Sequence, residues 1–264
     1  MSGLKKFYCV ILIFVFLLTV CSPLWAALNL NKLTDDDIKQ VENLIEKLTP
    51  LIKERDQKQN LSRLTFKELY APLNVEEQAF LKQFESLDPQ EVGVKIPFRG
   101  MATGEEELVV IKGQRIKVKG KEEIQELPPQ FLPPYVYDAY FKMMEEMERG
   151  IGKRLYIESG YRSSAYQLYL FVYYLKNHDY SIRDTAGFVA LPGFSEHGAP
   201  EHQAIDFINA DGINGEDNPQ EFEDLSEYKW LLDNAGKFEF VLSYPKDAGG
   251  GITFEPWHWR YDKK

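Results

Sequence analysis

The sequence has only two cysteines, Cys9 and Cys21, and both lie close to its N-terminus. The rest of the chain has no thiol and cannot be held together by disulfide bonds. A block of basic residues is also missing, and the formal net charge is −10 at pH 7. This composition excludes nucleic acid as the expected partner, because phosphate backbones are bound by clustered lysine and arginine. With 44% hydrophobic residues, the chain is nevertheless globular in composition.

The N-terminal segment has the order of a secretory signal. Lys5 and Lys6 precede the apolar run "FYCVILIFVFLLTV", and "CSPLWAA" follows it. We therefore predict a signal peptide over residues 1–27, and an exported protein of the periplasm or cell envelope. The apolar stretch is also long enough to span a bilayer, so a retained membrane anchor is the alternative.

Residues 28–127 are predicted to form an accessory region of helices with some short strands. Thr34 is a candidate N-cap for an amphipathic helix, and Asn74 caps a second helix over residues 74–87. Between residues 94 and 120, the runs "VKIPF", "ELVVIKG" and "RIKVKG" favour short strands. The proline cluster "ELPPQFLPPY" then indicates a domain boundary near residue 127.

Residues 128–264 mix helices and strands without a repeating order. The pattern predicts helices at about 135–149 and 164–176, a strand at 154–159, and loops with short strands from there to the end. This combination predicts the α+β fold class.

The stretch "FEPWHWRY" contains one of only four histidines in the chain, His258. A neutral histidine can hydrogen-bond within a cluster of tryptophans, so His258 could be a core residue. It could equally be a metal ligand, and the rest of the sequence has to decide between the two.

A second stretch, "LPGFSEHGAPEHQAIDF", supplies His197, His202 and Asp206. A loop histidine followed by a carboxylate on a strand makes half of a metal site, which His258 would complete. Three protein ligands leave a fourth position open, as a catalytic zinc site requires. Manganese or iron can also bind such ligands.

Glu255 lies three residues before His258, close enough to reach the same metal. A carboxylate that does not bind the metal is the usual base for the attacking water. A salt bridge between Glu255 and Arg260 is the alternative.

The third stretch, "IESGYRSSAYQLYLF", places Arg162 between a strand and a helix. Ser164 and Gln167 have the spacing of a capping box. A guanidinium beside a helix N-terminus can bind a carboxylate, because the free N–H groups also favour an anion. A structural ion pair is the other explanation for Arg162.

Together, "SGYRS", "PGFSEH" with "QAIDF", and "EPWHWRY" resemble the VanY-type zinc D-alanyl-D-alanine carboxypeptidases, whose superfamily includes L-alanyl-D-glutamate endolysins. The resemblance covers roughly residues 136–261. It implies a compact α+β domain in which a small antiparallel sheet, flanked by helices, holds one zinc ion. Residues 128–264 would then be the catalytic domain.

The resemblance also implies roles for individual residues. By its motifs, Glu255 and Arg162 would be catalytic. The metal ligands would be His197, Asp206 and His258. Arg162 would also contact the substrate, together with Ser195 and Gln167.

One departure concerns the spacing of two ligands. The family pattern S-x-H-x-x-G-x-A-x-D separates histidine and aspartate by seven positions, whereas His197 and Asp206 are nine apart. The loop between them is enlarged, and His202 becomes a rival ligand. We favour His197 because it alone lies in the "SEH" context.

The activity implied is hydrolysis of peptidoglycan stem peptides, with removal of the terminal D-Ala from D-Ala-D-Ala ends. An endopeptidase or a D,D-dipeptidase of the same superfamily is the alternative among enzymes. A zinc-containing wall-binding module without activity is the alternative from another class. The stem peptide is the expected partner, and protein partners remain open.

Overall fold

The computed structural model describes residues 27–247 and 253–263. The predicted signal peptide, except Ala27, and the glycine turn predicted at residues 249–251 lie outside these residues. Within the part of the chain that is described, no helix combines the length and apolar character needed to cross a membrane.

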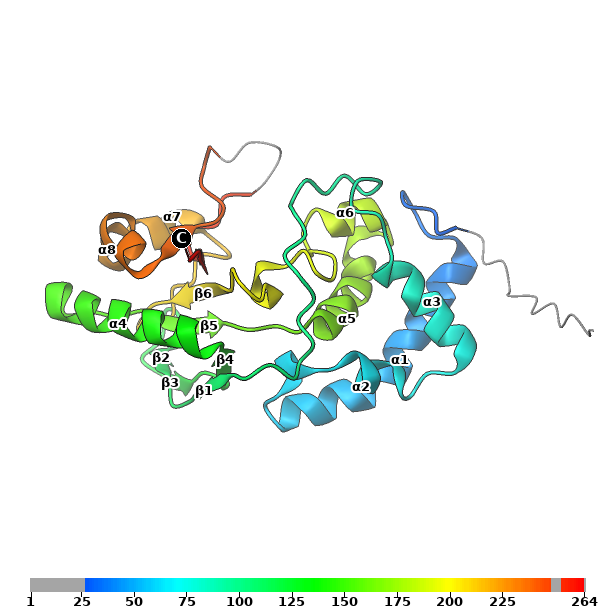
Figure 1. The fold of residues 1–264 in the computed structure, drawn as a ribbon, viewed down its shortest axis with the longest axis horizontal. Helices are drawn as coiled ribbons and strands as arrows, with labels where there is room; N and C mark the ends of the chain where they lie inside the picture. Colours follow the sequence, from blue (N-terminus) through cyan, green and yellow to red (C-terminus); the bar gives the residue numbers. More distant parts are fainter. Residues whose placement is uncertain (1–26, 248–252, 264) are drawn as a thin grey trace, which may run out of the picture.

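The elements form two groups that lie side by side (Figure 1). The helical group combines elements from both sides of the boundary predicted at residue 127. Its members are α1 (Asp35–Gln57), the short helix η1 (Leu61–Arg63), α2 (Phe66–Tyr70), α3 (Val75–Glu85), α5 (Ser164–Tyr174), η2 (Leu175–His178) and α6 (Ile182–Ala186).

The first long helix begins where the sequence predicts. The Thr34 hydroxyl accepts a hydrogen bond from Asp37 N, and the Asp37 carboxylate accepts one from Thr34 N. These bonds satisfy N–H groups that have no partner within the helix. Asn74 caps α3 in the same way with Glu77, so both predicted N-caps are confirmed.

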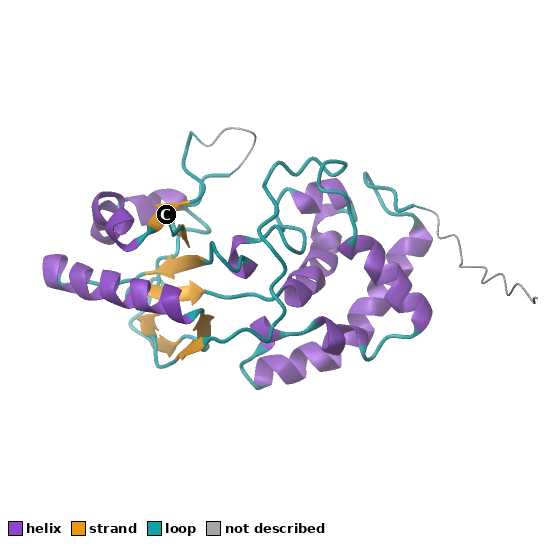
Figure 2. Cartoon of the chain, viewed as in Figure 1, coloured by secondary structure: helices purple, strands orange, loops and turns teal. Residues whose placement is uncertain are grey.

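The second group is built on a four-stranded antiparallel sheet with the order β5-β6-β8-β7. Figure 2 shows strands in orange and helices in purple. The strands of this sheet are β5 (Tyr156–Ser159), β6 (Ala204–Ile208), β7 (Phe240–Leu242) and β8 (His258–Tyr261). The accompanying helices are α4 (Pro134–Ile151), α7 (Pro219–Glu223), α8 (Ser226–Asn234) and η4 (Ala235–Phe238). The predicted α+β fold, a small antiparallel sheet flanked by helices, is confirmed.

Two smaller antiparallel pairs precede this sheet in the chain. They are β1 (Val109–Ile111) with β4 (Gln130–Leu132), and β2 (Arg115–Lys117) with β3 (Ile124–Glu126). The prediction of a strand in "VKIPF" was wrong, because residues 94–98 form an irregular loop that follows a turn. Pro97 has no N–H to donate to a neighbouring strand. Just before it, Val94 N donates to Pro89 O and closes a turn.

Each group of elements encloses its own apolar core. Leu44, Phe84 and Phe171 pack in the helical core, while Phe207 and Trp259 pack in the core of the sheet group. Because α5 shares its core with α1 and α3, the helical core contains residues from both sides of position 127. The division of the chain at residue 127 stays a prediction.

Two further details differ from expectation. Residues 219–234 form α7 and α8 rather than loops and short strands, because Phe222, Tyr228 and Leu231 cover the sheet core. The N-cap of α5 is Ser163, whose hydroxyl accepts from Tyr166 N, and not Ser164.

Because β5 of the sheet leads directly into α5 of the helical core, we expect the two groups to unfold together. Phe84→Ala should lower stability by about 3–5 kcal/mol, because Phe84 is fully buried. The described tryptophans all belong to the sheet group. In a Trp25→Phe background, tryptophan fluorescence therefore reports on the sheet group. The unfolding transition of Phe84→Ala measured by fluorescence should shift together with the one measured by circular dichroism. The exposed Val75→Ala is the control. The prediction would be wrong if circular dichroism showed the helices of Phe84→Ala unfolding first while its fluorescence transition stayed as in the parent protein.

Candidate metal centre and active site

Strand alternation sets the direction of His258. Trp257, Trp259 and Tyr261 lie in the core of the sheet group, and side chains one position apart point to opposite faces of a strand. His258 consequently faces away from the tryptophans, and its register partner on β6 is Asp206. The tryptophans fix the strand, and the histidine is left to meet the carboxylate.

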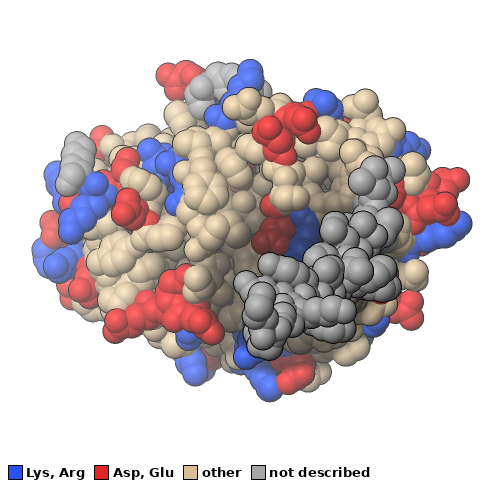
Figure 3. Space-filling model, turned by 45° about the vertical axis from the view of Figure 1, so that its right-hand side comes forward, with Lys and Arg blue, Asp and Glu red and all other residues tan. Residues whose placement is uncertain are grey.

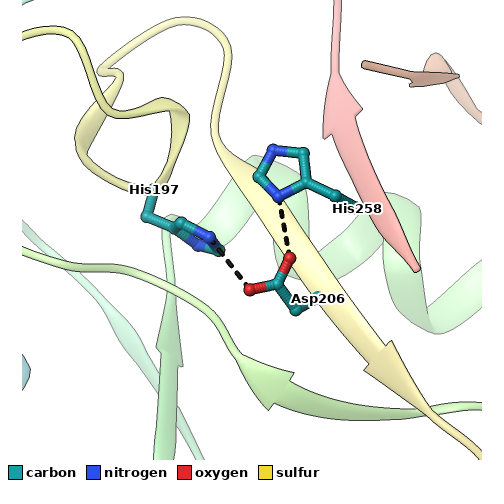
Figure 4. A group of neighbouring side chains, drawn as sticks. All are labelled: His197, Asp206 and His258. Carbon is teal, nitrogen blue, oxygen red and sulfur yellow. Dashed lines mark hydrogen bonds and ion pairs between the residues drawn. The ribbon is translucent and has the colours of Figure 1, made fainter. Parts of the chain in front are cut away.

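His197 reaches the same carboxylate from η3 (Glu196–Gly198), as Figure 4 shows. Its Nε2 lies 3.0 Å from Asp206 Oδ2, and His258 Nδ1 lies 2.7 Å from Asp206 Oδ1. One ligand atom from each of the three residues falls within 4.8 Å of the others. The structure thus brings the three predicted ligands together.

The remaining ring nitrogen of each histidine faces a protein acceptor. His197 Nδ1 lies 2.8 Å from Gly160 O, and His258 Nε2 lies 3.2 Å from Glu196 Oε2. Such partners fix the orientation of imidazoles that bind metals. Two oriented imidazoles and a carboxylate fit a zinc ion.

The electrostatics of the group also suit a cation. Burial by itself would raise the pKa of Asp206, yet the two imidazoles hold it far below its usual range. Burial would lower the pKa of His258, but the carboxylates of Asp206 and Glu196 raise it to about 10. Burial lowers the pKa of His197. The site therefore keeps its carboxylates ionised and attracts positive charge.

Glu255 lies beside this group without belonging to it. Its Oε2 is 3.9 Å from His258 Nδ1, the nitrogen that faces Asp206. Burial raises the pKa of the Glu255 carboxyl to about 7. Arg260, the alternative partner, instead pairs with Asp262 at 3.3 Å. The position of Glu255 suits a proton acceptor at the metal.

Arg162 is joined to the metal group through its backbone, since its N–H donates to His197 O at 3.0 Å. Its guanidinium donates to Gln167 Oε1 at 3.1 Å and to Ser159 Oγ at 3.2 Å. Gln167 is buried and donates to Ala190 O. The structure therefore shows Gln167 orienting Arg162.

Ser195 directly precedes η3 and is buried, and its side chain makes no cap for that helix. It lies two positions before His197 in the chain. Its predicted contact with a substrate carboxylate stays a prediction.

The expected anion site at the N-terminus of α5 was wrong in one respect. The N–H of Ser164 donates to Ala102 O, and that of Tyr166 donates to the Ser163 hydroxyl. These N–H groups are already satisfied, partly by a segment that precedes the catalytic region. These two N–H groups therefore add nothing to the Arg162 guanidinium as a site for a carboxylate.

His202, the rival ligand, lies apart from the metal group. Its Nδ1 is 3.1 Å from Asp262 Oδ1, and its side chain is about one-third exposed, at 32%. Among the described residues, the cluster that can hold a metal contains His197 and not His202.

Two residues at the site were not singled out from the sequence. Glu196 was treated only as context within "SEH", although its position beside His197 could have drawn attention to it. Arg99 Nη2 lies 2.6 Å from Glu196 Oε1. No local pattern connects Arg99 with a residue 97 positions away.

On the face in Figure 3, lysine and arginine lie interspersed with aspartate and glutamate. A pocket of about 430 Å³ is lined by Ser159 and Arg162 on one side and by Asp56, Gln59 and Ser62 on the other. The helical group thus forms a wall beside Arg162.

A pair of imidazoles and a carboxylate next to a further carboxylate is typical of metal-dependent hydrolases. Residues 130–264, just over half of the chain, match the family model described as "VanY: D-alanyl-D-alanine carboxypeptidase". The chain belongs to this family. The resemblance to VanY-type enzymes and the prediction of a peptidase are therefore confirmed.

Similar curated proteins include the bifunctional D-Ala-D-Ala dipeptidase and D-Ala-D-Ala carboxypeptidase VanXYC of Enterococcus gallinarum. It is 32% identical over 151 residues, covering 52% of this chain and 75% of that protein. A D-alanyl-D-alanine carboxypeptidase of Enterococcus faecalis is 43% identical over 75 residues, covering 28% of this chain and 24% of that one. A solved structure of the LdcB LD-carboxypeptidase aligns with a TM-score of 0.46 and 25% identity, covering 66% and 77% of the two chains.

His258 and His202 each lie next to an acidic side chain, so a comparison of variants at the two positions tests the ligand set. His258→Ala should abolish stoichiometric zinc binding, because only two of the three candidate ligands remain. His202→Ala should leave it unchanged. Elemental analysis after dialysis against a zinc buffer measures both variants. Retention of stoichiometric zinc by His258→Ala, or its loss from His202→Ala, would contradict the assignment.

Proposed function

We propose that this chain is a zinc-dependent carboxypeptidase that removes the terminal D-alanine from peptidoglycan stem peptides ending in D-Ala-D-Ala. The observation that carries the proposal is the convergence of His197, Asp206 and His258 beside the buried Glu255. Membership of the VanY family supports the choice of substrate.

His197 Nε2, an Asp206 oxygen and His258 Nδ1 would hold the single zinc ion. The ion would supply Lewis acidity, which lowers the pKa of the attacking water and polarises the scissile carbonyl. Glu255 accepts a proton from that water and returns it to the departing amine. A pKa near 7 suits both transfers, because the group then accepts and releases protons near neutral pH.

Arg162 would stabilise the negative charge that develops on the carbonyl oxygen. Gln167 and Ser159 hold the guanidinium in place before the substrate arrives. Preorganised donors of this kind need no reorientation during the reaction. Arg162, with the neighbouring Ser195 and Gln167, is also our candidate for binding the substrate's terminal carboxylate.

We further propose that the enzyme acts outside the cytoplasmic membrane. The support is the charge and apolar order of residues 1–27, which resemble a signal peptide or anchor. Fractionation of cells that produce the chain with a C-terminal tag tests this, and a tag found in the cytoplasm would contradict it.

The activity is tested with a stem pentapeptide ending in D-Ala-D-Ala, followed by mass spectrometry with and without a chelator. Loss of a single alanine that the chelator abolishes is the expected result. The free dipeptide D-Ala-D-Ala and a C-terminally amidated pentapeptide serve as comparison substrates. Faster cleavage of either would indicate a dipeptidase or an endopeptidase and contradict the proposal.

The role of Glu255 predicts a separation of turnover from metal binding. Glu255→Gln should reduce kcat by at least about 10²–10⁴-fold, the usual contribution of a general base. Bound zinc should stay at one ion per chain, because Glu255 is not a ligand. Glu201→Gln, at an exposed residue of the loop between His197 and Asp206, is the control. Wild-type turnover by Glu255→Gln would exclude Glu255 as the base.

A further inference from the structure

A segment from outside the matched region reaches the metal centre. Residues 98–106, here called the crossing segment, connect α3 to β1 and run between the two groups of elements (Figure 1). Hydrogen bonds fix this backbone to the catalytic region. They are Arg99 N to Gly193 O at 2.7 Å, Ala102 N to Ser164 Oγ at 2.9 Å, and Gly104 N to Tyr161 OH at 2.9 Å.

The contact next to Arg99 is close. Gly193 has a φ of +82°, and a Cβ at this position would collide with the ring of Phe98. Phe98 also packs edge-on against Phe194, with ring centroids 5.5 Å apart. The start of the crossing segment is therefore seated on the loop that leads into η3.

The side chain of Arg99 ends at Glu196. Its Nη2 lies 2.6 Å from Glu196 Oε1, and the two side chains are only 16% and 1% exposed. The other carboxylate oxygen of Glu196 lies 3.2 Å from His258 Nε2. Arg260 Nη1 lies farther away, 3.8 Å from Glu196 Oε1. Arg99 is thus the short cationic contact of the carboxylate that orients a metal ligand.

Glu196 needs such a partner because it is buried. Its side chain is only 1% exposed, and a buried carboxylate is unfavourable unless positive charge or hydrogen bonds compensate it. An ionised carboxylate with one oxygen on Arg99 and the other toward His258 has a defined orientation. Without Arg99, the carboxylate could rotate toward Arg260 and leave His258.

We propose that Arg99 is a positioning residue of the metal centre. It holds Glu196 where the carboxylate accepts the His258 Nε2–H, so that Nδ1 faces Asp206 and the metal. This inference rests on the proposed zinc site, but it assigns part of that site to a region outside the matched residues 130–264.

The test measures the zinc dissociation constant of the purified chain by competition with a chromophoric chelator. Arg99→Ala should weaken zinc binding by about tenfold, at the low end for residues that orient metal ligands. Arg99→Lys should recover part of the loss, because its ammonium keeps the charge. The absorption spectrum of the cobalt-substituted protein should change in Arg99→Ala as His258 reorients.

Arg63→Ala is the matched control for a purely structural effect. Arg63 binds the same crossing segment through the carbonyl oxygens of Gly104 and Glu106, and not through Glu196. It should lower the thermal midpoint while leaving zinc affinity and the cobalt spectrum unchanged. Equal losses of zinc affinity in Arg63→Ala and Arg99→Ala would overturn the proposal.

A double mutant tests whether Arg99 acts through Glu196. Glu196→Gln should itself weaken zinc binding by about 10–100-fold, and adding Arg99→Ala should cost little more. Full additivity, or wild-type affinity of Arg99→Ala, would overturn the proposal and leave the proposed function intact. A wild-type chain that binds no zinc would overturn both.

Discussion

The buried carboxylate of Asp206, held between two imidazoles, is the interaction on which the site depends. A buried carboxylate is unfavourable unless positive charge or hydrogen bonds compensate it. His258 provides both, and His197 lies against the other carboxylate oxygen. The outer nitrogens of the two rings face Gly160 O and Glu196. Because ligands must lose their protons to bind a metal, a cation that enters replaces the proton of His258. The carboxylates that raise the pKa of His258 therefore also favour the metal.

The N-terminal helices are part of the structure that supports this site. They share an apolar core with α5, and Arg162 immediately precedes the Ser163 cap of that helix. Ser163 N donates to Ser62 O, and its hydroxyl donates to Leu64 O. The residue proposed to bind substrate, Arg162, is thereby anchored by the segment that links α1 to α2. The accessory region contributes to the geometry of the active site as well as to stability.

Local patterns predicted much of this arrangement, and long-range contacts were beyond them. The caps at Thr34 and Asn74 depend on residues three positions apart, so the sequence alone reveals them. The motif around His258 likewise predicts a metal ligand, although the tryptophans on either side left a core histidine as the alternative. Arg99 and Glu196 meet only because the chain crosses between two groups of elements, and residues 219–234 become helical by covering the sheet core. Neither the contact between Arg99 and Glu196 nor the helices at residues 219–234 can be recognised from a local sequence pattern.

His197 and Asp206 are nine positions apart instead of seven, yet they meet at one site, and the contacts at each end of the loop explain why. His197 is held at one end by the bond from Arg162 N to its carbonyl oxygen, and Asp206 is held by pairing with His258 on β8. The residues between these fixed points form a loop, in which Pro200 packs on Gly100 and accepts a hydrogen bond from Tyr135. Lengthening such a loop by two residues costs little entropy. The anchors, rather than the length of chain between them, set the distance between the ligands.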